Sequence, residues 1–209
     1  VTLTGQLALL MLIEKCELAG IKVVSANTDG FVSKIPKHLL DTYTKICSEW
    51  SQMTGFNLEE THYTGLYSRD VNNYFAVTTD GKVKGKGVFA SSGIAKNPQL
   101  PIVSEAVKNY IISGKPFIDT LKSCSDISEF ISVRSVTGGA VFGNEYLGRV
   151  VRWVYTTDGG VITYKKNGNR VPKSDGSKPF QTLPSQLPSE IDYDRYVKEC
   201  ENLYSTVVR

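Results

Sequence analysis

The chain has 209 residues, a formal net charge of +3 and 41% hydrophobic side chains, which suits one large or two small folded domains. This composition excludes disorder throughout, and it excludes a transmembrane helix because Glu14 and Lys15 end the most apolar run, Leu7–Ile13, far too early. No positively charged segment precedes that run, so we expect no signal peptide.

The first expected elements are a helix and a β-hairpin. Thr4–Ala19 is apolar on most faces, which predicts a buried helix. Two β-rich runs follow, Ile21–Ala26 and Phe31–Ile35, and the turn-forming residues Asn27–Gly30 between them predict an antiparallel hairpin. Because the chain starts at Val1 rather than Met and enters the helix almost at once, we expect a piece of a longer polypeptide that lacks part of an active site.

A second helix and further strands are expected next. Pro36 starts the helix, apolar side chains recur at helical spacing, and Gly55 ends it. The strand-like stretches that follow, the last two joined by an Asp-Gly turn, are Phe56–Tyr67, Tyr74–Thr78 and Lys82–Phe89. This order of elements predicts an α+β fold in which an antiparallel sheet is packed with helices.

Ser, Gly and Pro accumulate near residues 91–101, and we expect a domain boundary there, between residues 1–95 and 96–209. The second domain is expected to be mixed and mainly helical. Its expected elements are short helices over Ser104–Ser113, Phe117–Cys124 and Ile127–Val133, short strands with glycine-rich turns over 134–178, and a terminal helix over Ile191–Val207.

The cysteines are scattered along the chain. The shortest separation among Cys16, Cys47, Cys124 and Cys200 is 31 residues, so no pair has the spacing of a zinc site or a redox motif. The two histidines are too few for a metal site built from histidine. Scattered single cysteines are typical of a reducing compartment, so we expect a cytoplasmic protein that is not secreted.

The expected hairpin turn carries the most chemical information. Asp29 lies among small neighbours at the tip, where a rigidly held carboxylate can present its oxygens to a hard cation such as Mg²⁺. The same tetrapeptide also fits a plain turn in which Asp29 bonds its own backbone. Taken alone, the tetrapeptide favours the plain turn.

The surroundings of this turn resemble family B DNA polymerases, most closely the divergent phage-type enzymes. Lys-Val-Val-Ser-Ala-Asn-Thr-Asp-Gly at 22–30 resembles the palm hairpin motif of that family. Leu66–Val77 occupies the place of the downstream Tyr-containing motif that packs on the primer strand, and Lys82–Gly87 that of a second hairpin. Ile191–Tyr196 resembles the entry to the last thumb helix. The resemblance therefore implies that residues 1–95 are the C-terminal part of a palm and residues 96–209 a DNA-gripping thumb.

The resemblance implies an activity and a metal. A primer 3′-hydroxyl would attack the α-phosphate of a deoxynucleoside triphosphate during DNA replication and release pyrophosphate. Asp29 aligns with a metal-binding aspartate of the motif, and Asn27 would shape the turn. The reaction uses two Mg²⁺ ions, so residues outside this chain, in the upstream part of the same polymerase, would complete the site. The isolated chain would then be inactive, and a phage-encoded enzyme would work in the host cytoplasm.

The resemblance also implies primer–template contacts by Arg69, Tyr74, Lys82, Lys84 and Lys86. The residues themselves leave alternatives open, because Arg69 could pair with the adjacent Asp70 and Tyr74 could be a core side chain. Period-two spacing places the three lysines on one face of a strand, which suits a nucleic-acid backbone or a protected edge strand. Gly85 and Gly87 would permit a close backbone approach or form a bulge.

Residues 134–178 hold eight basic and three acidic side chains, a net charge of +5 that suits a phosphate backbone or a solvated surface. Arg149, Arg152 and Trp153 combine basic and aromatic character there and could hold a duplex or stack a base, or form a strand with solvated arginines. Two other functions fit the sequence: a non-catalytic nucleic-acid-binding module with a basic face, and an interaction protein whose charges serve solubility. No membrane partner is expected.

Overall fold

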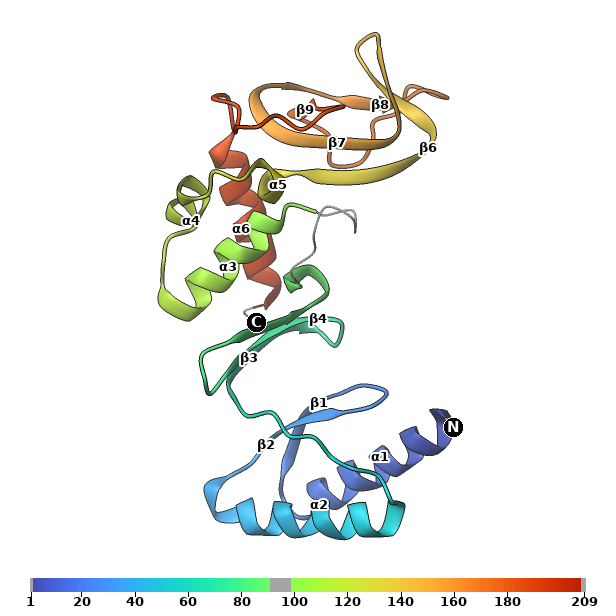
Figure 1. The fold of residues 1–209 in the computed structure, drawn as a ribbon, viewed down its shortest axis with the longest axis vertical. Helices are drawn as coiled ribbons and strands as arrows, with labels where there is room; N and C mark the ends of the chain where they lie inside the picture. Colours follow the sequence, from blue (N-terminus) through green and yellow to red (C-terminus); the bar gives the residue numbers. More distant parts are fainter. Residues whose placement is uncertain (1, 91–98, 208–209) are drawn as a thin grey trace. The chain divides into compact units, whose positions relative to one another are not determined.

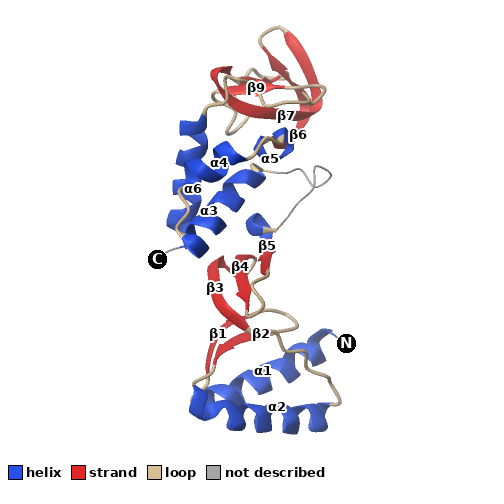
Figure 2. Cartoon of the chain, turned by 60° about the vertical axis from the view of Figure 1, so that its left-hand side comes forward, coloured by secondary structure: helices blue, strands red, loops and turns tan. Residues whose placement is uncertain are grey.

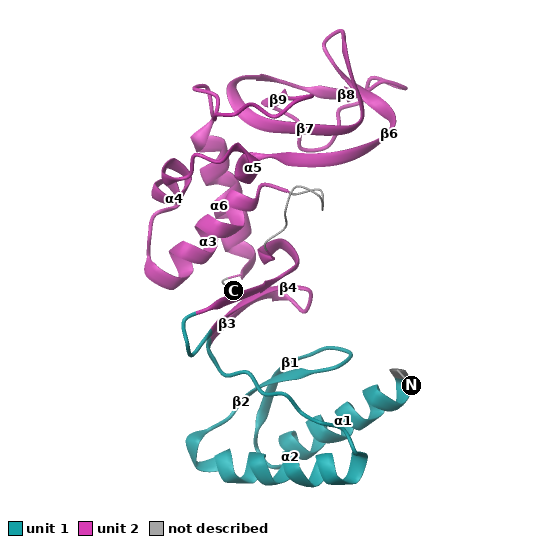
Figure 3. Ribbon diagram, in the orientation of Figure 1, with its two compact units in different colours: residues 1–64, 78–81 teal, residues 65–77, 82–209 magenta. Residues whose placement is uncertain are grey.

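The computed structural model describes residues 2–90 and 99–207, which form a mixed α+β fold as expected (Figures 1 and 2). The chain divides into two compact units, residues 1–64 with 78–81 and residues 65–77 with 82–209 (Figure 3). The domain boundary expected near residues 91–101 falls mostly on 91–98, which lie outside the described residues. No helix in the described ranges is long and apolar enough to cross a membrane.

The first unit contains a pair of packed helices and a β-hairpin. In chain order its elements are α1 (Thr2–Leu18), β1 (Lys22–Ala26), β2 (Phe31–Lys34), the 3-10 helix η1 (Lys37–Leu39) and α2 (Leu40–Thr54). The hairpin and both helices are where the sequence predicts them. Gly55, with φ of +73°, ends α2 as expected, because the left-handed backbone there suits a residue without a Cβ.

Trp50 of α2 anchors the core of the first unit. Its side chain is 4% exposed and belongs to the same buried cluster as Leu12, Cys16 and Ile21. Its indole Nε1 donates a hydrogen bond to the backbone oxygen of Ala8 at 2.7 Å. This bond ties α2 to α1, and α1 leads directly into the β1–β2 hairpin, so the helix pair supports the hairpin.

The expectation that the first helix is buried on most faces is wrong. Leu7, Leu10 and Leu18 of α1 are 58%, 59% and 83% exposed, whereas Leu12 and Cys16 are fully buried. In the first unit α1 packs against α2 and β1, so only part of its apolar surface finds partners. Apolar composition makes burial favourable, but the neighbouring elements decide which faces are covered.

The second unit contains most of a three-stranded sheet, four α-helices and a four-stranded sheet. The elements of this part of the chain are β3 (Tyr63–Asp70), β4 (Asn73–Thr78), β5 (Val83–Lys86), the 3-10 helix η2 (Gly87–Phe89), α3 (Pro101–Ser113), α4 (Phe117–Ser123), α5 (Ile127–Phe130), β6 (Ser132–Phe142), β7 (Glu145–Gly160), β8 (Ile162–Tyr164), β9 (Ser177–Pro179) and α6 (Tyr193–Val207). The strand orders are β3-β4-β5 and β8-β6-β7-β9.

Two expected strands are shorter than predicted. The stretch Phe56–Tyr67 becomes a strand only from Tyr63, because strand propensity needs a pairing partner before it forms a ladder. The stretch Lys82–Phe89 is extended only up to Lys86 and then turns into η2. Gly87 begins that turn with φ of +64°, a left-handed conformation that ends the extended backbone.

The opposite difference occurs in the four-stranded sheet, where strands are longer than expected. The helix predicted over Ile127–Val133 ends at Phe130, because Ser132 and Val133 pair with β7 instead. Strands β6 and β7 have 11 and 16 residues, although short strands were expected over 134–178. Gly138 and Gly139, both with φ of +84°, lie in an irregularity of the ladder. These glycines bend the hairpin without ending it, as bulges do.

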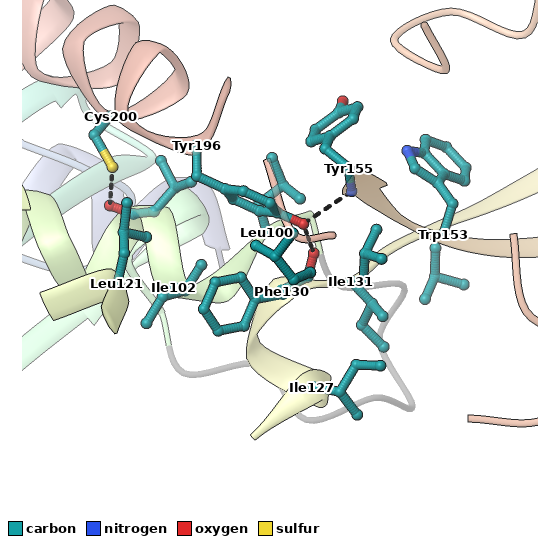
Figure 4. Close-up of a cluster of buried hydrophobic side chains, with 14 of the residues drawn as sticks. Leu100, Ile102, Leu121, Ile127, Phe130, Ile131, Trp153, Tyr155, Tyr196 and Cys200 are labelled. Carbon is teal, nitrogen blue, oxygen red and sulfur yellow. Dashed lines mark hydrogen bonds between the residues drawn. The ribbon is translucent and has the colours of Figure 1, made fainter. Parts of the chain in front are cut away.

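Tyr196 of α6 joins the helices to the four-stranded sheet. Its side chain is fully buried, and its hydroxyl donates to the backbone oxygen of Phe130 at 2.7 Å (Figure 4). The same hydroxyl accepts from the backbone N–H of Tyr155 at 3.1 Å. Burial holds the pKa of Tyr196 far above its usual range, so the phenol stays in the neutral form that can donate.

The thiols of Cys16 and Cys200 are expected to be unreactive in the folded protein. All four cysteines are free, and burial raises the pKa of Cys16 to about 11 and that of Cys200 to about 12. Because the thiolate is the nucleophile, both should resist an aromatic disulfide reagent at mildly alkaline pH until urea unfolds the chain. A variant with alanine at Cys47 and Cys124 isolates the two thiols, and rapid labelling of its folded form would contradict this expectation.

Candidate metal-binding hairpin and nucleic-acid interface

Asn27 closes the turn of the β1–β2 hairpin. Its Oδ1 accepts the backbone N–H groups of Asp29 at 3.1 Å and Gly30 at 2.8 Å. Its own N–H donates to the backbone oxygen of Gly30 at 2.9 Å. Strand pairing begins next to the turn, with Ala26 opposite Phe31. The short amide side chain therefore holds the tip that carries Asp29 in one conformation.

Asp29 is the exposed carboxylate of this turn. The Asn27 amide oxygen already accepts two backbone donors, so Asp29 is the acid at the tip that can face a cation. Within residues 2–90 and 99–207, no three His, Cys, Asp or Glu side chains gather where they could hold a metal ion. A single carboxylate fits one ligand position of Mg²⁺, so a metal at Asp29 needs further oxygen ligands.

Arg69 and Asp70 lie at the end of β3, where the surface ion pair considered above is present. Arg69 Nε lies 3.7 Å from Asp70 Oδ2, with side chains that are 43% and 44% exposed. Asp70 has closer partners in the turn to β4. Asn73 Nδ2 donates to both oxygens of the Asp70 carboxylate, at 2.9 and 3.0 Å, and the backbone N–H of Asn72 donates to the same carboxylate at 2.9 Å. Arg69 therefore adds little to the turn, and its guanidinium can serve a partner.

The pKa of Asp70 lies below its ordinary value, chiefly because Asn73 donates to the carboxylate and secondly because the Asn72 N–H does. The pKa of Asp70 is lower in the folded state than in the unfolded state. Its carboxylate therefore stabilises the folded state at pH values above the unfolded-state pKa, and this contribution is lost as pH falls through the folded-state pKa. A carboxyl NMR titration should show an upward shift of this pKa in Asn73→Ala. Arg69→Ala should shift it less, and the reverse order would contradict the stated cause.

Tyr74, Lys84 and Lys86 share one face of the β4–β5 hairpin. Tyr74 pairs with Lys86 and Ala76 with Lys84, and directly paired residues point to the same side of a sheet. Tyr74 is half-buried, whereas both lysines are exposed on β5, the edge strand of the three-stranded sheet. Lys82 is also exposed but precedes β5, so it is outside the ladder. This face suits a phosphate backbone and equally protects an edge.

The glycines between these lysines serve the protein's own backbone. A Cβ on Gly85 would collide with the carbonyl oxygen of Phe89, and one on Gly87 with the carbonyl oxygen of Asn72. On the opposite face of β4, the fully buried Phe75 stacks on Tyr67 at 4.9 Å and contacts Phe89 at 5.2 Å between ring centroids. These contacts hold the basic face on a packed support.

The three residues expected to act together on β7 are separated by the structure. Trp153 is 1% exposed in the core, which rules out the alternative in which it stacks a base (Figure 4). Its large apolar surface gains more from burial in the core cluster than from solvent exposure. Arg149 is exposed and Arg152 is half-buried opposite Val133. Three positions apart on an extended strand, the two arginines point to opposite faces.

Part of the positive charge of residues 134–178 is neutralised internally. Arg170 pairs with Asp175 at 2.9 Å, and Lys178 with Asp158 at 3.0 Å. Arg134 donates to a backbone oxygen, that of Pro172, at 2.7 Å. The remaining basic side chains of this segment form no ion pair within the described residues: Arg149, Arg152, Lys165, Lys166 and Lys173.

One exposed aromatic side chain, that of Tyr146, is not indicated by any motif in the sequence. Tyr146 of β7 is 47% exposed, and Lys165 Nζ lies 4.6 Å from the centroid of its ring. The two residues are far apart in sequence, and only the pairing of β7, β6 and β8 brings them together. In the sequence, the adjacent Lys165 and Lys166 indicate a basic surface in this segment, but they do not indicate that it lies beside Tyr146.

Comparisons of the chain with protein-family models and with curated proteins gave no match. No relative therefore supports or opposes the resemblance to family B polymerases. Function is inferred from the residues of this chain and from their placement in its two units.

Proposed function

We propose that this chain is the C-terminal palm and thumb portion of a template-directed DNA polymerase similar to family B. The observation that carries the proposal is the β1–β2 hairpin. Its exposed Asp29 is held in a turn closed by the Asn27 side chain, within the stretch 22–30 that resembles the polymerase motif. A carboxylate on a rigid hairpin tip is a suitable ligand for a hard cation.

In this proposal Asp29 supplies one Mg²⁺ ligand, and the upstream part of the same polymerase supplies the others. When bound, two Mg²⁺ ions stabilise the attacking 3′-oxygen and the leaving phosphate. The exposed Leu7, Leu10 and Leu18 of α1 support a larger assembly, because an apolar patch is expected where another part of the enzyme packs. The deoxynucleoside triphosphate would bind mainly to that other part.

The primer–template would lie against the basic faces of the second unit. Tyr74, Lys84 and Lys86 form one such face, with Arg69 at the end of β3 and Lys82 before β5. Arg149 and Arg152 would act separately, each from its own side of β7. Contacts of this kind go to phosphates and carry no base information, as a replicative enzyme requires. The enzyme would work in the cytoplasm, that of the host if a phage encodes it.

Neutralising Lys84 and Lys86 together should weaken binding of a primer–template duplex about equally for unrelated sequences. Each lost phosphate contact should flatten the slope of log affinity against log salt by roughly 0.9. Fluorescence anisotropy at several salt concentrations measures this slope. The matched control is Lys108→Ala with Lys178→Ala, because both ammonium groups already pair with carboxylates. Equal effects of the two double variants would show that β5 makes no specific DNA contact.

The second candidate is a non-catalytic nucleic-acid-binding module. The basic β4–β5 face favours it, since this face needs neither a metal nor Asp29. Such a module would show the same loss of duplex affinity in the lysine variant. The polypeptide that contains such a module would show no Mg²⁺-dependent primer extension that requires Asp29, so primer extension by that polypeptide separates the two functions.

A further inference from the structure

The four-stranded sheet presents a tyrosine and two cationic side chains together on one face. Tyr146 pairs with Val141, Val141 with Thr163, and Thr163 forms a bridge with Arg170. Cross-strand partners point to the same side, so these four residues form a row. The row crosses the neighbouring strands β7, β6 and β8 (Figure 1) and the segment that follows them. Lys165 also reaches this face, because its Nζ lies 4.6 Å from the Tyr146 ring centroid.

The Tyr146 ring is supported by the backbone beneath it. A Cβ on Gly139 would stand 2.6 Å from Tyr146 Cε2, so the ring occupies the space that a larger residue would take. Lys165 N–H donates to the backbone oxygen of Gly139 at 3.0 Å, and Gln181 Nε2 donates to that of Tyr146 at 3.2 Å. These bonds fix the backbone on which the ring lies, while 47% of the Tyr146 side chain stays exposed.

The charges around the ring favour an anionic partner. Lys165, Lys166 and Arg170 surround the outer end of β8, and all three are exposed. Asp175 pairs with Arg170 at 2.9 Å, so these two charges offset each other. Lys165 and Lys166 are then the cations of this face that form no ion pair within the described residues, while Glu145 Oε1 accepts from Gln181 Nε2 at 3.2 Å. The Lys165 stem is flexible, so its ammonium can leave the ring for a phosphate while a planar group takes its place.

We propose that this face binds single-stranded nucleic acid, with one base stacked on Tyr146 and the backbone phosphates at Lys165 and Lys166. An aromatic platform beside cations is the combination that holds unpaired strands, because every base has a flat apolar face. A duplex keeps its bases stacked inside and would use the cations alone. The proposal needs neither Asp29 nor a metal, so it goes beyond the polymerase function and does not rest on it.

Anisotropy titrations with labelled short oligo(dT), oligo(U) and a matched duplex test this proposal on the intact chain. Tyr146→Leu should weaken single-strand binding by about tenfold and leave duplex binding nearly unchanged. Tyr146→Phe keeps the ring and should bind as the wild type does. Lys165→Ala should flatten the salt slope for single strands by roughly 0.7. The matched control is Tyr110→Leu, which removes a tyrosine that is 37% exposed on α3.

Thermal unfolding checks that each variant is folded. If Tyr146→Leu does not fold, NMR of the wild type decides, because a stacked base should move the Tyr146 ring protons upfield on addition of oligo(dT). Unchanged affinity in a folded Tyr146→Leu, an equal loss for duplex and single strand, or unmoved ring protons would each overturn the proposal. Binding of either oligo(dT) or oligo(U) that depends on the Tyr146 ring supports the proposal. Loss of extension in an Asp29 variant leaves these outcomes untouched.

Discussion

Replacing Asp29 by alanine should lower the single-turnover rate of primer extension by at least about 10²-fold in the polypeptide that contains this chain. Affinity for the primer–template should stay nearly unchanged. The reason is that Asp29 would act on the metal ions, whereas lysine and arginine contacts with phosphates supply most of the duplex affinity. Asp29→Asn is the sharper variant, because it keeps the size of the side chain and removes only the charge.

Variants of Asn27 separate the chemistry of the hairpin from its shape. Asn27→Asp should be tolerated, because a carboxylate oxygen can accept the same N–H groups of Asp29 and Gly30. Asn27→Ala loses that acceptor and should reduce extension through a loosened turn. Near-normal extension by Asp29→Ala would refute the metal-binding role. If Asn27→Ala loses activity while Asp29→Ala keeps it, the hairpin has only a structural role.

Tyr196→Phe should destabilise the second unit by about 2–4 kcal/mol, because two buried backbone groups each lose their partner. Those groups are the Phe130 carbonyl and the Tyr155 N–H, both bonded to the same buried hydroxyl. The change removes one oxygen and leaves the packing of the ring in place. Urea unfolding followed by tryptophan fluorescence measures the effect. A Trp50→Phe background removes the tryptophan signal of the first unit, so that the fluorescence reports on Trp153 alone.

Tyr155→Phe provides the matched control for this experiment. The Tyr155 hydroxyl donates to the backbone oxygen of Lys173 at 2.7 Å, and Lys173 itself is exposed. Only one backbone group loses its partner there, so the expected loss is smaller, about 1 kcal/mol. If Tyr196→Phe costs no more than Tyr155→Phe, the hydroxyl of Tyr196 does not hold α6 on the sheet.

The local elements of this protein could be predicted from its sequence. The β1–β2 hairpin depends on Asn27–Gly30, whose dihedrals and side-chain bonds lie within one turn. The ends of α2 and α3 depend likewise on single glycines, Gly55 and Gly114, with φ of +73° and +74°. Short-range hydrogen bonds and left-handed backbone positions are properties of neighbouring residues, so a residue pattern is sufficient to indicate them. The position of Asp29 in a tight turn could therefore be predicted from the sequence alone.

Burial and strand pairing were decided by the tertiary structure. An apolar α1 gave no indication that Leu7 and Leu10 would stay exposed, because burial depends on which elements pack against the helix. The basic and aromatic character of residues 149–153 was compatible with base stacking by Trp153, but the folded chain buries that side chain in the core. The pairing of β7, β6 and β8 placed Lys165 over Tyr146, a contact between distant parts of the sequence. Such contacts depend on which segments meet in the folded chain, and residue periodicity carries no information about that choice.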